Sequence, residues 1–74
     1  MYKYNPDDFP EDIAENMRKV YRLYEANKHE NKYVELSTAI EELYYDLKDF
    51  RTFKIKPVAE VVEMQAYFRS LLYD

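Results

Sequence analysis

Apolar residues recur along most of this chain at intervals of three and four, the spacing that keeps them on one face of an α-helix. The first such series is Phe9, Ile13, Met17, Val20 and Tyr24. Asp8 and Glu11 stand three apart at its start, like the acceptor and the glutamate of a capping box. Pro10 is tolerated there because a first-turn residue needs no N–H. The pattern predicts a helix over 10–27, preceded by an extended tail over 1–9.

The strongest pattern lies in the middle of the chain, where apolar positions step alternately by three and four, as in a heptad repeat. These positions are Tyr33, Leu36, Ile40, Leu43, Leu47 and Phe50. They predict a second helix over 32–50, after a polar turn whose asparagines, Asn27 and Asn31, can cap the flanking helices. Thr38 and Glu41 also match a capping box, so a helix that begins near residue 38 stays open as an alternative.

A third amphipathic stretch closes the sequence. Its apolar residues form a broad face: Val58, Val61, Val62, Met64, Phe68, Leu71 and Leu72. They predict a third helix over 57–72. The preceding stretch, RTFKIKP, alternates polar and apolar residues, and Lys56 precedes a proline, which pushes it away from helical geometry. We therefore expect a connection there, with Phe53 or Ile55 tucked against the helices.

Three such helices joined by short linkers predict an all-α fold, a small three-helix bundle of up-down-up topology with a single domain over 1–74. A second arrangement stays open, in which a helical hairpin packs its third helix on another copy of the chain. It is attractive because a core of this size supplies only about 3–5 kcal/mol of net stability. The heptad pattern of the second helix, or the third helix, would then form the seam of a homodimer.

Composition narrows the class of protein. The chain has 74 residues and contains neither glycine nor cysteine, which argues against hairpin turns and phosphate-binding loops and excludes disulfides and thiolate metal sites. Its apolar runs are too short to span a bilayer, and its first residues lack the apolar segment of a signal peptide. We therefore expect no membrane association and a cytoplasmic location.

Candidate catalytic chemistry is sparse. A nucleophile needs a positioned base, and the single histidine, His29, lies in a polar turn with no motif that links it to Ser37 or Thr38. Glu25 and His29 are four residues apart, but a stable zinc site needs three or four ligands. We expect a protein that is not an enzyme and that carries no metal or cofactor.

Acidic residues and a tyrosine gather on the outer part of the predicted second helix. The candidate partner-binding residues are Glu41, Glu42, Tyr45, Asp46 and Asp49. Nine tyrosines exceed what so small a core requires, and tyrosine is enriched at binding hot spots. Two structural explanations compete with this one: the acids form an ordinary solvated face, and the tail folds back so that Tyr2 or Tyr4 packs over an exposed ring.

A small basic segment offers a different partner. Arg51, Lys54 and Lys56 alternate with Phe53 and Ile55, which is typical of a nucleic-acid contact. The net charge of −4 disfavours that interpretation, because nucleic-acid binders of this size are normally basic. Cations at the carboxyl end of a helix also stabilise the helix itself.

The sequence thus predicts a small acidic protein-interaction module that binds and inhibits or adapts a macromolecular partner with a basic surface. Its size, charge and composition resemble those of small bacterial or phage proteins, such as phage or mobile-element inhibitors, immunity proteins and antitoxins. Two alternatives stay open: a structural homo-oligomer formed through the second or third helix, and a nucleic-acid accessory protein that uses the 51–56 segment.

Overall fold

The computed structural model describes residues 2–52 and 58–73, and these residues form helices without any strand. The helices are η1, a short 3-10 helix (Pro6–Asp8), α1 (Glu11–Asn27), α2 (Tyr33–Thr52) and α3 (Val58–Ser70). The predicted all-α fold is confirmed. Compared with the expected bounds, α2 ends two residues later and α3 ends two residues earlier.

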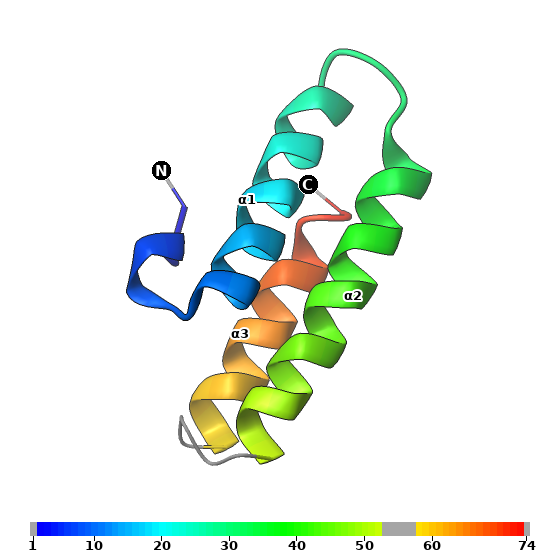
Figure 1. The fold of residues 1–74 in the computed structure, drawn as a ribbon. Helices are drawn as coiled ribbons and strands as arrows, with labels where there is room; N and C mark the ends of the chain where they lie inside the picture. Colours follow the sequence, from blue (N-terminus) through cyan, green and yellow to red (C-terminus); the bar gives the residue numbers. More distant parts are fainter. Residues whose placement is uncertain (1, 53–57, 74) are drawn as a thin grey trace.

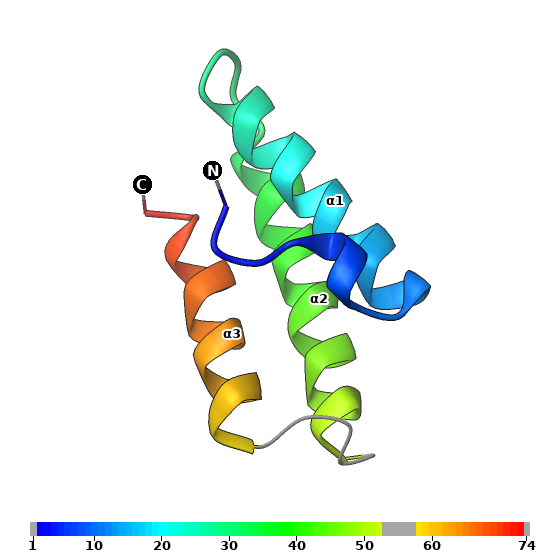
Figure 2. The same ribbon diagram turned by 90° about the vertical axis from the view of Figure 1, so that its left-hand side faces the viewer.

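The three α-helices pack side by side, and the chain direction alternates from each helix to the next (Figure 1). α2 contacts both α1 and α3, whereas the backbones of α1 and α3 do not approach each other closely within the described residues. The N-terminal segment crosses the space between α1 and α3 (Figure 2). The tail is therefore part of the packing arrangement.

The tail is not extended throughout, and the predicted capping box is wrong. Asn5 Oδ1 accepts the N–H of Asp7 at 3.0 Å, and Pro6 occupies the first position of η1. This combination favours a helical turn, because the cap satisfies a free N–H and proline already has the required φ. Asp8 belongs to that turn, so α1 begins after Pro10 without a side-chain cap.

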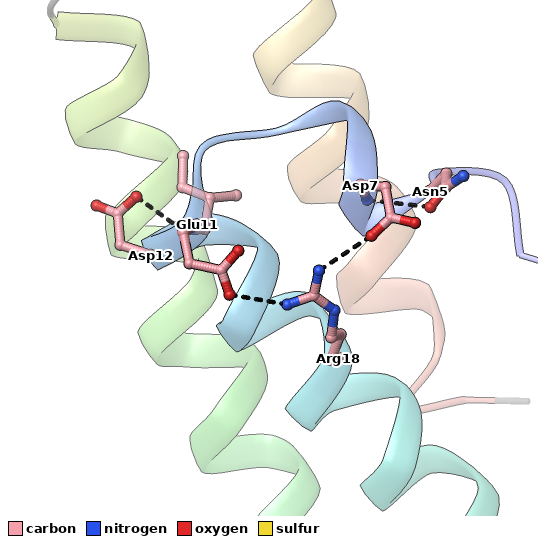
Figure 3. A network of polar contacts seen from close by, with 6 residues as sticks. Asn5, Asp7, Glu11, Asp12 and Arg18 are labelled. Atoms are coloured by element: carbon pink, nitrogen blue, oxygen red, sulfur yellow. Dashed lines mark hydrogen bonds and ion pairs between the residues drawn. The ribbon is translucent and has the colours of Figure 1, made fainter.

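An arginine ties this turn to α1 (Figure 3). The Arg18 guanidinium lies 3.0 Å from a carboxylate oxygen of Asp7 in η1 and 3.0 Å from one of Glu11 in the first turn of α1. All three side chains are exposed, and exposed ion pairs contribute little free energy. The network orients η1 more than it stabilises the fold.

The two asparagines of the α1–α2 turn both act through their side chains. Asn27 keeps a helical position, and its Oδ1 accepts the N–H of Lys32 at 2.8 Å. Asn31 Oδ1 accepts the N–H of Tyr33 at 3.2 Å, and the Lys32 carbonyl accepts the first helical bond, so Asn31 lies one residue before the N-cap position that it was predicted to occupy. α2 therefore begins at Tyr33, not near residue 38.

The core draws on all three α-helices. Its buried apolar side chains are Ile13, Met17, Val20, Tyr21, Leu36, Ala39, Ile40, Leu43, Leu47, Val61, Met64, Phe68 and Leu71. The heptad positions of α2 from Leu36 to Leu47 are thus covered by the chain's own helices. Within one copy of the chain they are therefore already buried.

Candidate protein-binding site

The five candidate residues of α2 do not form one free face. Glu42 points towards α1, where its carboxylate lies 3.7 Å from Lys19 Nζ. Asp46 accepts a hydrogen bond from the side-chain amide of Asn16, also in α1. Asp49 is exposed. Glu42 and Asp46, one helical turn apart, thus both contact α1 and have partners within the molecule.

Glu41 and Tyr45 lie on the other side of α2, where they line a hollow against α3. This hollow has a volume of about 310 Å³ and is lined by Ser37, Ile40, Glu41, Tyr44, Tyr45, Arg69 and Leu72. A second hollow of about 190 Å³ is lined by Tyr44, Val62, Gln65, Ala66 and Arg69. Because the two share Tyr44 and Arg69, we treat them as one surface and call it the α2–α3 groove.

A cation and two aromatic rings form the centre of the groove. The Arg69 guanidinium carbon lies 5.0 Å from the centroid of the Tyr44 ring, within the range of a cation–π contact. Tyr44 meets Tyr45 edge to face, with centroids 5.8 Å apart. Over residues 2–52 and 58–73, neither Arg69 nor Glu41 forms an ion pair. The groove therefore presents one cation and one anion whose charges are not neutralised by ion pairs of that part of the chain.

Gln65 links the two helices that form the groove. Its side chain is buried, and its Nε2 donates to the backbone oxygen of Tyr44 at 3.1 Å. This bond joins the middle of α3 to the part of α2 that carries the ring pair. Gln65 and Arg69 were not among the residues predicted from the sequence. The signal for Gln65 was a polar residue set beside Met64 within an apolar helix face.

Apolar side chains extend from the groove along α3. Val62 lines the second hollow and is 48% exposed, and Val58, one turn earlier, is 58% exposed. The opposite side of α3 is buried in the core through Val61, Met64 and Phe68. A helix that is apolar on both sides normally buries both of them. The outer side of α3 therefore has the character of a contact surface.

The tail tyrosines are used inside the molecule. The Tyr2 ring stacks on Tyr21 with centroids 3.9 Å apart, and the Tyr4 ring meets Tyr67 at 5.3 Å and Phe68 at 6.0 Å. The tail thus folds back, as one of the two structural explanations expected. That explanation accounts for Tyr2 and Tyr4 but leaves the pair on α2, where Tyr45 is 54% exposed.

The structure gives less information on the other candidates, the basic segment 51–56 and a possible metal site. Lys54 and Lys56 lie outside the described residues, and Arg51 is described only as part of the α2 backbone. Glu25 accepts a hydrogen bond from the Tyr2 hydroxyl, which lowers the pKa of its carboxyl group. In residues 2–52 and 58–73, no three histidine, aspartate or glutamate side chains are grouped so that they could hold a metal ion. In the same residues, no helix combines the length and apolar character required to cross a membrane.

Comparisons with protein-family models, with curated proteins and with solved structures gave no match for this chain. The function of the chain is therefore inferred from the α2–α3 groove and its side chains.

Proposed function

We propose that this protein is a non-enzymatic interaction module that binds a macromolecular partner through the α2–α3 groove. The observation that carries the proposal is the exposed ring of Tyr45 beside the Tyr44–Arg69 pair, in a hollow of about 310 Å³. Tyrosine and arginine are two of the residue types that dominate binding hot spots, which occupy well-packed pockets. The groove supplies both residue types where a partner side chain can enter.

The charges of the groove narrow the chemistry of the partner. Glu42 and Asp46 have partners in α1, so fewer of the four candidate acids of α2 are available to a partner than the sequence indicates. Glu41 and Arg69 stand on opposite helices at the same hollow. A fitting partner presents an apolar side chain to the rings, a basic group towards Glu41 and an acidic group towards Arg69. An amphipathic helix laid into the groove meets these requirements.

Binding of this kind suits a small protein that blocks or adapts its target. We keep the proposal made from the sequence, a cytoplasmic inhibitor, immunity protein or antitoxin of bacterial or phage type. Its support is the small size, the acidic charge and a binding face built from side chains on two regular helices.

A homo-oligomer is the second candidate, and the exposed valines of α3 favour it. In a two-fold interface each contact occurs twice, so Arg69 of one copy would meet Glu41 of the other and the reverse. Sedimentation equilibrium over a wide concentration range separates the two candidates, because a protein that stays monomeric throughout removes the second. For nucleic acid, a gel shift at low salt with no retarded band removes the remaining alternative.

The test of the main proposal compares matched variants in partner capture. Tyr45→Ala combined with Arg69→Ala removes the centre of the groove. Tyr33→Ala removes another exposed ring of α2, and Glu42→Ala removes the acid that faces α1. Each protein is used as bait in a lysate of the organism that encodes the chain, and captured proteins are quantified by mass spectrometry. Affinity for a purified partner is then measured by calorimetry.

We expect the groove variant to bind at least about tenfold more weakly than the wild type, as for hot-spot residues. The two control variants should bind within about twofold, because they lie outside the groove. Circular dichroism must show the same helix content in all four proteins. Equal affinity of the groove variant and the wild type would refute the site.

A further inference from the structure

The N-terminal residues lie between α1 and α3 (Figure 2), and their contacts with these helices are of the kind that a bound peptide makes. Their main chain is hydrogen-bonded to both helices. The Lys3 N–H donates to the Tyr67 hydroxyl of α3 at 3.2 Å, and the Tyr21 hydroxyl of α1 donates to the Tyr4 carbonyl at 2.8 Å. One tyrosine from each helix thus forms a hydrogen bond with the backbone of the tail.

The side chains of the tail also contact both helices. The Tyr2 ring stacks on Tyr21, and its hydroxyl donates to Glu25 of α1. Lys3 Nζ lies 2.8 Å from a carboxylate oxygen of Glu63 in α3.

The ring of Tyr4 occupies the next position along the segment, against Tyr67 and Phe68 of α3. Each residue of the Tyr-Lys-Tyr segment therefore has its own partner in the helices. The rings of Tyr2 and Tyr4 pack against aromatic side chains, and Lys3 between them pairs with the carboxylate of Glu63.

We propose that this surface is a second binding site, separate from the α2–α3 groove, for a partner segment with an aromatic–basic–aromatic pattern. We call it the tail site; its residues are Tyr21, Tyr24, Glu25, Glu63, Tyr67 and Phe68. In the free protein the chain's own Tyr2, Lys3 and Tyr4 occupy it. A partner segment of the same pattern displaces them and leaves η1 in place on Arg18.

Two features of the structure support displacement. The contacts of residues 2–4 are all non-covalent, and the backbones of α1 and α3 are joined through α2 and do not contact each other closely within the described residues. The helix pairs α1–α2 and α2–α3 therefore do not depend on the tail for their backbone packing. The charge of Glu63 agrees as well, since its carboxylate attracts the basic residue of such a segment, whereas Glu25 is paired with Lys28 and accepts the hydroxyl of Tyr2.

The tail competes with any partner because it is attached. A short linker gives a tethered segment an effective concentration of about a millimolar. The experiment therefore weakens the attached tail first, in the full-length chain, with Tyr2→Ala and Tyr4→Ala together. The probe is a synthetic peptide with the sequence of residues 1–9. The control peptide carries the same two alanine substitutions.

Binding is followed by nuclear magnetic resonance of the labelled protein. We expect saturable chemical-shift changes at Tyr21, Tyr67 and Phe68, and at least about tenfold weaker binding of the control peptide. Glu63→Lys in the same protein should weaken the native peptide by about threefold or more, and a peptide that carries Lys3→Glu should recover that loss. A structural role of Glu63 alone would not produce this recovery.

Other outcomes overturn the proposal. Absence of saturation at several times the effective concentration of the tail, or equal binding of both peptides, would show that the surface recognises no such segment. If the doubly substituted chain loses its helical circular dichroism, the peptide must restore it; failure to restore it would make the tail a permanent part of the core. A wild-type dimer that disappears on Tyr2→Ala and Tyr4→Ala would assign the site to the tail of a second copy.

Discussion

The ring of Tyr2 lies flat against the ring of Tyr21, with centroids 3.9 Å apart and planes 6° from parallel. One residue stands at the start of the chain and the other in the middle of α1, so this contact anchors the tail to the helices. Tyr21 is also in contact with Phe68 of α3 at 5.6 Å. The tail thus completes an aromatic cluster that links α1 with α3.

Removal of the Tyr2 ring should destabilise the protein without unfolding it. We expect Tyr2→Ala to lower the free energy of unfolding by about 1–2 kcal/mol, from the lost ring pair and the lost burial. Urea denaturation followed by circular dichroism measures the change. Tyr73→Ala is the matched control, because Tyr73 is 79% exposed. A control loss as large as that of Tyr2→Ala would contradict the assigned role of the stacked pair.

Alkaline pH should loosen the tail before it unfolds the helices. Burial, followed by the hydrogen bond to Glu25, raises the pKa of Tyr2 from 10.0 to about 12, and burial also raises the pKa of Tyr21. As pH rises above 10.0, the unfolded chain loses these protons first and is favoured, so stability present below that pH is progressively lost.

Tyr2→Phe removes one of the two groups and should make this loss less steep, whereas Tyr73→Phe should not. The measurement is the urea midpoint as a function of pH, together with the ultraviolet absorbance of ionised tyrosine. Identical pH profiles for wild type and Tyr2→Phe would show that Tyr2 ionises as freely as in the unfolded chain.

A carboxylate in place of the buried amide of Gln65 should be costly at neutral pH. The introduced group would face the Tyr44 carbonyl oxygen, to which Gln65 now donates. We expect Gln65→Glu to lower the free energy of unfolding by about 1–3 kcal/mol when the group is ionised.

Burial would raise the pKa of that introduced carboxyl, so part of the loss should return as pH falls and the group becomes a donor. Ala66→Glu adds the same charge at an exposed neighbouring position and serves as the control. Unfolding curves at neutral and acidic pH test this, and a pH-independent loss for Gln65→Glu would contradict the proposed contact.

The exposed network around Arg18 should contribute little. In a double-mutant cycle of Asp7→Ala and Arg18→Ala, we expect a coupling free energy below about 1 kcal/mol that shrinks as salt is added. Asp8→Ala is the control within the same 3-10 helix. A coupling larger than the loss from Tyr2→Ala would mean that ion pairs, not aromatic rings, hold the tail.

The periodic apolar positions predicted the helices, because every side chain that repeats at three and four residues must share one helix face. Leu36, Leu43 and Leu47 are accordingly buried, and Tyr45, on the opposite side of α2, is exposed. Its neighbour Tyr44 points in a different direction and is half-buried beside Arg69.

The candidate site could be predicted only in part, since Glu41 and Glu42 are adjacent in sequence but face different helices. Helical geometry places their side chains about 100° apart. Which of them meets a basic side chain depends on where α1 and α3 pack around α2, and sequence spacing contains no such information. The groove also needs Arg69, whose role depends on its position over Tyr44.

The sequence by itself determined the three helices, most of the residues on their buried faces and an excess of tyrosine over the needs of the core, because these follow from local periodicity and composition. Only the tertiary structure decided that Tyr2 and Tyr4 return to fill the space between α1 and α3, and that Tyr44 and Arg69 meet across a groove that Tyr45 also lines. Those contacts join residues up to 64 positions apart, and their formation depends on how whole helices pack together.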